Sequence, residues 1–184
     1  WESESWSIEK GGKYFVTRND SSIIAFNVGK EDYHYQITAS HSDSPTFKIK
    51  DKADTLKADY VTLNVESYGS MIHSTWLDRP LSVAGRVMVR EDSSLFSHLI
   101  YIDKDILMIP NAPIHLNKSL NDGYKYNLQK EMCPIFSCGK LGSEDFDKMI
   151  ADKLGVKTHQ IVAKDLFLVN RQRPTIWGEK EEFI

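Results

Sequence analysis

The segment LSVAGRVMVR at residues 81–90 decides the fold class. Every second residue in it is apolar or glycine, namely Leu81, Val83, Gly85, Val87 and Val89. Alternation with a period of two predicts a β-strand that buries one face. Shorter β-type segments lie on both sides of it, at residues 61–65, 99–102, 106–109 and 164–169. The middle of the chain is therefore predicted to be a small β-barrel or β-sandwich.

The flanks of this β-rich middle supply the other predicted elements. Residues 13–18 and 23–28 surround a cluster of turn-forming residues, which predicts a hairpin. One helix is expected, capped by Ser143 and ended by Gly155. Residues 48–58 are rich in Lys and Asp and poor in apolar side chains, so a solvated loop that crosses between domains is expected there.

Composition and charge exclude several classes of protein. A length of 184 residues with 41% hydrophobic content suits one domain or two small ones with a real core. A net charge of -3 without a basic cluster argues against nucleic-acid binding, and no apolar run approaches the roughly 18 residues of a membrane span. Cys133 and Cys138 are too few for a disulfide framework, so ordinary thiols in a reducing, cytoplasmic compartment are expected. The ends, Trp1 and Phe183-Ile184, predict a fragment of a longer protein.

The segment ITASHSDSP at residues 37–45 is the candidate chemical site. Apolar and polar residues alternate from Tyr33 to Ala39, which predicts a strand that ends near His41. In an extended chain His41 and Asp43 point to the same side. A neutral imidazole can then bind a metal through one nitrogen while a carboxylate holds the other ring N–H. Ligands gather at the carboxyl ends of strands in open α/β sheets, which is where this pair would lie.

Plainer interpretations stand beside these. A His-x-Asp sequence also occurs in ordinary loops that hold a hydrogen-bonded histidine, and one His with one Asp cannot complete a zinc site of about four ligands. His115, taken by its spacing, is typical of a surface or structural histidine. For Asp78 and Arg79 a buried structural ion pair is favoured over catalysis.

Four blocks of residues point to a known family. They are SHSDSP at 40–45, LNVESYG at 63–69, TWLDRPLSVAGRV at 75–87, and the segment from Ile109-Pro110 to Asn117. In this order the chain resembles the aspartyl aminopeptidase and aminopeptidase I family of metallopeptidases, from Trp6 to Ile184. The third of these blocks is long and unusual, which makes a chance agreement implausible.

The resemblance implies a particular architecture. Members have an α/β catalytic domain with a mixed sheet, interrupted by a β-rich domain used in subunit contacts, and they assemble as tetrahedral dodecamers. On this basis residues 1–47 and 175–184 are parts of the catalytic domain, and residues 48–174 are the inserted β-rich oligomerisation domain. The partners expected are peptide substrates and other copies of the chain, with no nucleic acid and no membrane.

The resemblance also implies an activity and its residues. Members use two divalent metal ions, usually zinc with manganese or cobalt as alternatives, to activate water and remove N-terminal, often acidic, residues from peptides. His41 matches a metal ligand, Asp43 matches the catalytic carboxylate that orients it, and His115 matches a histidine that contacts substrate in a neighbouring subunit's active site. The family's other ligands and its general base would follow residue 184, and Glu181-Glu182 does not match them. The alternative is that this segment acts as an assembly or scaffold module without catalytic activity of its own.

Overall fold

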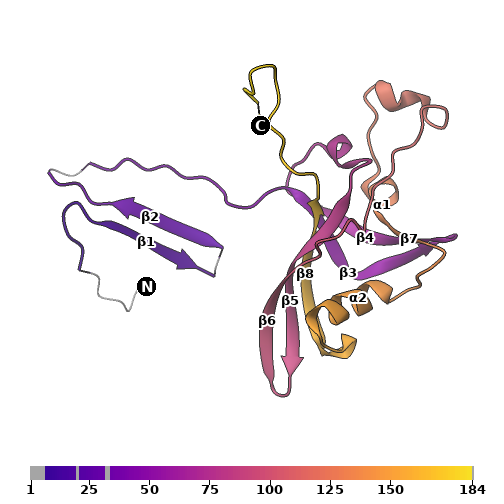
Figure 1. Cartoon of the computed structure of the whole chain (residues 1–184), viewed down its shortest axis with the longest axis horizontal. Helices are drawn as coiled ribbons and strands as arrows, with labels where there is room; N and C mark the ends of the chain where they lie inside the picture. Colours follow the sequence, from indigo (N-terminus) through magenta and orange to yellow (C-terminus); the bar gives the residue numbers. More distant parts are fainter. Residues whose placement is uncertain (1–6, 20, 32–33, 184) are drawn as a thin grey trace. The chain divides into compact units, whose positions relative to one another are not determined.

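The computed structural model describes residues 7–19, 21–31 and 34–183, which form two units, 1–44 and 45–184. The first unit contains one antiparallel hairpin, β1 (Lys13–Arg18) with β2 (Ser22–Asn27), drawn in indigo in Figure 1. The predicted hairpin is therefore confirmed, with Asp20 of its turn lying outside the described residues.

The second unit is built on one antiparallel six-stranded sheet with the order β6-β5-β8-β3-β4-β7. Its strands are β3 (Thr46–Lys57), β4 (Tyr60–Tyr68), β5 (Leu81–Glu91), β6 (Ser94–Tyr101), β7 (Ile135–Cys138) and β8 (Ile161–Asn170). The helices are short: η1 (His73–Trp76), η2 (Lys118–Asn121), α1 (Leu128–Glu131), α2 (Asp145–Leu154) and η3 (Thr158–Gln160). None of the helices in the described ranges is long and apolar enough to cross a membrane. The β-rich prediction is confirmed. In the sheet order β6 and β7 are the two end strands and do not pair with each other, so closure into a barrel stays a prediction.

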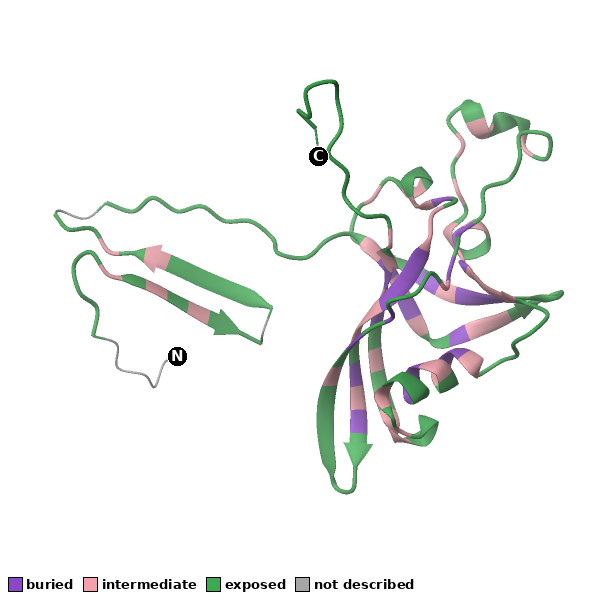
Figure 2. Ribbon diagram, viewed as in Figure 1, coloured by how far each residue is buried: buried purple, intermediate pink, exposed green. Residues whose placement is uncertain are grey.

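The core lies where the inner faces of the strands meet α2, and Figure 2 shows it as the purple part of the ribbon. On β5 the side chains of Val83, Val87 and Val89 are fully buried, as the alternation predicted. Phe146 and Ile150 of α2 are equally buried and join the same cluster. Burial of such side chains contributes about 1.5–3 kcal/mol each relative to exposure, so this cluster is the main source of stability of the unit.

The solvated loop expected at residues 48–58 is wrong, because β3 occupies most of that range. Phe47 and Ile49 of β3 are buried, and the lysine between them lies on the other face. Lys48 forms an ion pair with Asp165 on the neighbouring strand β8, at 2.7 Å. The charged side chains of this range therefore lie on the outer face of a strand and not in a loop.

The strand expected to lead into His41 is also wrong. The described residues 34–44 form neither strand nor helix, and Tyr35 and Ile37 are 92% and 83% exposed; Tyr33 lies outside the described residues. A strand needs a neighbour that satisfies its backbone N–H and C=O groups. The described hairpin does not pair with this segment, so the alternation alone does not produce a strand.

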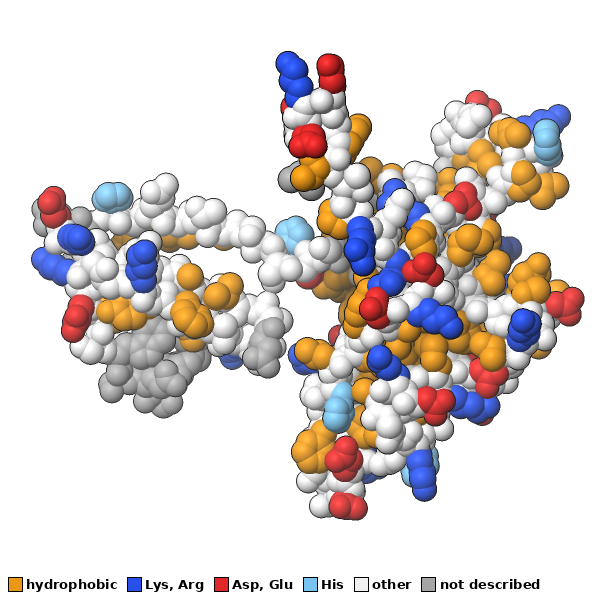
Figure 3. Space-filling view, viewed as in Figure 1, with side chains coloured by type: hydrophobic (Ala, Val, Ile, Leu, Met, Phe, Trp, Pro, Cys, Tyr) orange, Lys and Arg blue, Asp and Glu red, His pale blue; other side chains and the backbone are white. Residues whose placement is uncertain are grey.

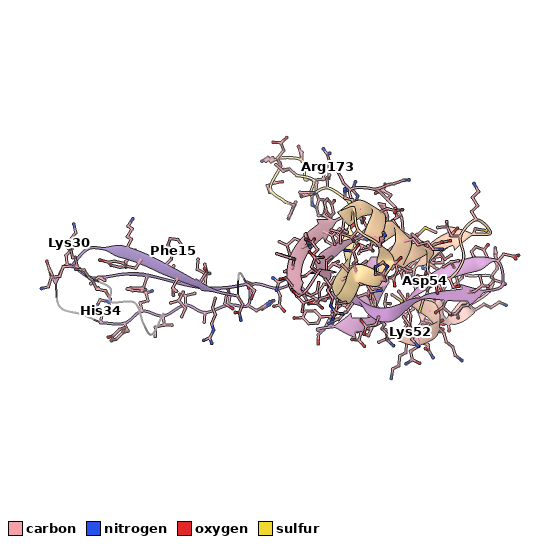
Figure 4. The ribbon with its side chains drawn as sticks, turned by 90° about the horizontal axis from the view of Figure 1, so that it is seen from below. Phe15, Lys30, His34, Lys52, Asp54 and Arg173 are labelled. Atoms are coloured by element: carbon pink, nitrogen blue, oxygen red, sulfur yellow. The ribbon has the colours of Figure 1, made fainter. Side chains whose placement is uncertain are left out.

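Helix α2 is where the sequence predicted it, but its N-terminus is capped differently. Glu144 occupies the cap position at φ 72 and provides no side-chain cap, whereas Gly155 ends the helix in the left-handed region as predicted. The carboxylate of Asp54 on β3, labelled beside the helix in Figure 4, accepts the backbone N–H of Phe146 at 3.2 Å. Burial raises the pKa of the Asp54 carboxyl above its ordinary value. Ser143, the expected cap, is thus replaced by a residue distant in sequence.

Candidate functional site

The first candidate feature is the contact between His41 and Asp43. Nδ1 of His41 lies 3.0 Å from Oδ1 of Asp43 and 2.7 Å from its backbone oxygen. A carbonyl oxygen and a carboxylate oxygen only accept hydrogen bonds, so in the neutral imidazole Nδ1 carries the proton and Nε2 carries the lone pair. The imidazole is 76% exposed, which leaves Nε2 open to a ligand. This is the arrangement that a metal-binding histidine requires, with its carboxylate partner in place.

A second contact fixes this segment to the hairpin. The Ser42 hydroxyl donates to the backbone oxygen of Ser21, the residue directly before β2, over 3.0 Å. Ser42 stands between His41 and Asp43, so the anchor acts directly on the pair. This hydrogen bond, rather than strand pairing, attaches the His41–Asp43 segment to the hairpin.

The donor set available for a metal ion is incomplete within the described ranges. No group of three His, Cys, Asp or Glu residues that could hold a metal occurs among residues 7–19, 21–31 and 34–183. A catalytic zinc site takes about three protein ligands and a water. Nε2 of His41 fits one of these ligands, and the carboxylate of Asp43 is already engaged at Nδ1.

The second candidate feature is a projecting arm, residues 110–134, that contains His115. Figure 1 shows the segment in salmon and orange, extending away from the sheet of its unit before it returns through α1 to β7. His115 lies in a turn closed by the backbone N–H of Leu116 donating to the oxygen of Pro113, at 2.8 Å. The neighbours of His115 in the chain are apolar yet exposed, Ile114 by 43% and Leu116 by 81%. In Figure 3 the arm accordingly shows orange and blue side chains together at its outer end.

Hydrogen bonds within the arm make it an ordered structure. The Glu131 carboxylate accepts the Tyr124 hydroxyl and, at 2.5 Å, the backbone N–H of Asn127. These bonds lower the pKa of Glu131, the Tyr124 bond foremost, and the same contact raises the pKa of Tyr124. The Asn127 side chain in turn caps α1 by accepting the N–H groups of the next turn.

The start of the arm is held by Asp78, for which the sequence analysis favoured an ion pair. Asp78 and Arg79 do not form the expected buried ion pair: Asp78 is exposed, and neither residue has an ion-pair partner within 4.0 Å in the described chain. Instead the Asp78 carboxylate accepts the backbone N–H of Asn111 at 2.9 Å. Asp78 lies in a block that carries the family resemblance, but nothing in its neighbours along the chain indicates this contact.

A cavity of about 290 Å³ lies where the arm meets the sheet. Its lining includes three tyrosines and two lysines, Tyr60, Tyr124, Tyr126, Lys57 and Lys130. These residues come from separate segments, so no sequence pattern indicates the cavity.

Comparison with known proteins places these features in context. The family described as aminopeptidase I zinc metalloprotease (M18) matches residues 1–184. Two curated relatives, both named probable M18 family aminopeptidase 2, are 44% identical in Clostridium acetobutylicum and 42% identical in Clostridium novyi. Each alignment covers 100% of this chain and 44% of the relative, so the chain spans less than half the length of these relatives.

Solved structures give the same result. A chain of the Ape4 and Nbr1 complex, solved by cryo-electron microscopy, superposes with a TM-score of 0.82 at 34% identity, covering 98% of this chain and 39% of that chain. The S. cerevisiae mApe1 dodecamer shares the fold with a TM-score of 0.66 at 22% identity, covering 94% of this chain and 40% of that chain.

Proposed function

Because the chain belongs to the aminopeptidase I (M18) family of zinc metalloproteases, we propose that it forms part of a zinc-dependent aminopeptidase. The proposed reaction is hydrolysis of the N-terminal residue of a peptide, with acidic residues among the substrates and two divalent metal ions at the centre. The relatives are named as peptidases, so a purely structural assembly module is not favoured.

The observation that carries the proposal is the His41–Asp43 contact. A zinc ion bound at this site would supply a Lewis acid and would make water easier to deprotonate. In this chain Nε2 of His41 would be one ligand, and Asp43 would hold the imidazole in the tautomer that exposes that nitrogen. The remaining ligands and the general base would come from outside the described residues.

We further propose that residues 1–47 and 175–184 belong to the catalytic domain. Apolar side chains stand exposed in these ranges, including Phe15 at 67%, Ile37 at 83% and Trp177 at 63%. In each unit such exposed apolar side chains are candidates for surfaces that another structure covers.

Residues 48–174 would then form the assembly domain, with the arm as the part that reaches a neighbouring subunit. The exposed apolar neighbours of His115 support this, since a partner surface would bury them. His115 would contact the substrate there and stabilise the developing negative charge. The proposed assembly is a homo-oligomer, a dodecamer like that of the yeast relative, located in the cytoplasm.

The test is a metal and activity measurement on the full-length peptidase. His41→Ala is expected to lose about one metal ion per subunit and nearly all turnover of aminoacyl amides with N-terminal Asp or Leu. His34→Ala is the matched control, because His34 is an exposed histidine of the same irregular segment. Normal metal content and turnover in His41→Ala would remove this residue from the site.

A further inference from the structure

Asp78 has a backbone conformation that is uncommon for a residue with a side chain. Its φ is 55°, in the left-handed region, directly after the buried Leu77 and before Arg79. Asp tolerates this region better than most residues, but the conformation still has a cost that the surrounding contacts must offset.

Asp78 forms two hydrogen bonds in this conformation. The backbone N–H of Asp78 donates to the oxygen of Ile109 at 2.9 Å, and its carboxylate accepts the backbone N–H of Asn111, also at 2.9 Å. Both partners belong to the short segment from which the arm begins. Asp78 therefore holds both Ile109 and Asn111, which are two positions apart in that segment.

The other side of the same segment is held by the sheet. The backbone N–H of Ile135 donates to the oxygen of Met108 at 2.7 Å, and the reverse bond measures 3.3 Å. The start of the arm is thus fixed between Asp78 and β7. Pro110 and Pro113 restrict the backbone from there to His115.

We propose that Asp78 is a positioning residue for His115: it fixes the direction in which the arm leaves the sheet, and with it the place of the imidazole. The proposal rests on the proposed role of His115 in substrate contact. A displacement of about 1 Å at a reacting centre can lower the rate about a hundredfold, so a fixed arm base matters to the reaction.

The structural part is tested by amide hydrogen exchange on the 184-residue chain. In Asp78→Ala the Asn111 amide is expected to exchange about tenfold faster, since its only described acceptor is removed. Asp78→Asn keeps an acceptor oxygen and tolerates the left-handed region, so exchange should stay near wild type. Asp92→Ala is the matched control, because Asp92 has φ 53° in the turn between β5 and β6, away from the arm.

The functional part is tested in the full-length peptidase with kcat/KM. Asp78→Ala is expected to lower kcat/KM about 10- to 100-fold, and Asp78→Asn is expected to keep it near the wild-type value. In a His115→Ala background, Asp78→Ala should lower kcat/KM by less than a further factor of about three. An undiminished kcat/KM in Asp78→Ala, while His115→Ala is impaired, overturns the positioning role and leaves the proposed function standing. An equal loss in both backgrounds also overturns it. If His115→Ala itself is fully active, the proposed role of His115 fails and the positioning role fails with it, whatever the exchange rates show.

Discussion

Replacement of Gly85 by alanine is expected to destabilise the second unit more than any comparable glycine replacement. Gly85 lies within β5 and pairs with Ile100 on β6 and with Leu166 on β8. Its φ is 152°, and a Cβ built there would stand 2.1 Å from the backbone oxygen of Asp165 and 2.9 Å from the Cα of Leu166. Both of these atoms are backbone atoms, so no side chain can turn aside to make room.

The magnitude follows from these distances. Restoring an ordinary contact requires β5 and β8 to separate locally by about 1 Å, which weakens their hydrogen bonds and disturbs a close-packed core. Together with the unfavourable φ, we expect a loss of about 4 kcal/mol in the free energy of unfolding. For a chain of this size that corresponds to a fall of about 8–16 °C in Tm.

Gly139→Ala separates the two contributions. Gly139 has φ 65°, but no atom lies within 4 Å of the position that an added methyl group would occupy, so only the backbone contribution applies and about 1 kcal/mol is expected. Thermal and urea unfolding of the 184-residue chain, followed by far-ultraviolet circular dichroism, measures both variants. If Gly85→Ala costs no more than Gly139→Ala, the argument from the close approach of β5 and β8 is refuted.

Three further results are expected. Asp43→Asn in the full-length protein should weaken metal affinity about 10- to 100-fold while His41 is kept, as measured by competition with a chelator; unchanged affinity would show that Asp43 does not orient the ring. Because hydrogen bonds lower the pKa of Glu131, its stabilisation of the arm should be present above the ordinary carboxyl pKa of about 4.3 and be lost as pH falls through the lowered value; arm amide protection against pH in wild type and Glu131→Gln checks this. Because burial raises the pKa of Asp54, ionisation of its carboxyl opposes folding. The contribution of the protonated carboxyl to the free energy of unfolding is therefore complete below its unfolded pKa, and it is lost as pH rises through its folded pKa. Asp54→Asn should flatten that dependence in urea titrations, whereas Asp54→Ala should lose the cap of α2 and about 1 kcal/mol at any pH.

The elements that the sequence predicted correctly are those determined by local pattern. The alternation in β5 and the glycine that ends α2 are both visible in a few consecutive residues. β3 was missed because its many charged residues are typical of a loop. An irregularity between Ile49 and Asp54 also breaks the alternation of apolar and polar residues. The segment before His41 shows the opposite error, since its alternation is clear but the described residues offer it no paired strand.

The candidate site divides in the same way. His41 and Asp43 are two residues apart, so their contact follows from the extended chain and could be predicted. Asp78 and Asn111 are separated by 33 positions, and only the folded sheet brings them together. The motif that contains Asp78 and Arg79 suggested a buried ion pair, whereas Asp78 is exposed and neither residue has an ion-pair partner among the described residues.

The paired residues Met108 and Ile135 give the arm a property of its own. Since the chain leaves and re-enters the sheet beside this bridge, the length of the segment between its two ends changes the entropy of loop closure only slowly, by about 0.6 kcal/mol for each doubling. Insertions or deletions in the outer part of the arm, between Ile114 and Gly123, should thus leave the register of the strands intact, because Tyr126 and Leu128, which pack against the core, are kept. The outer part of the arm can therefore vary in length while the hydrophobic core of the sheet is kept.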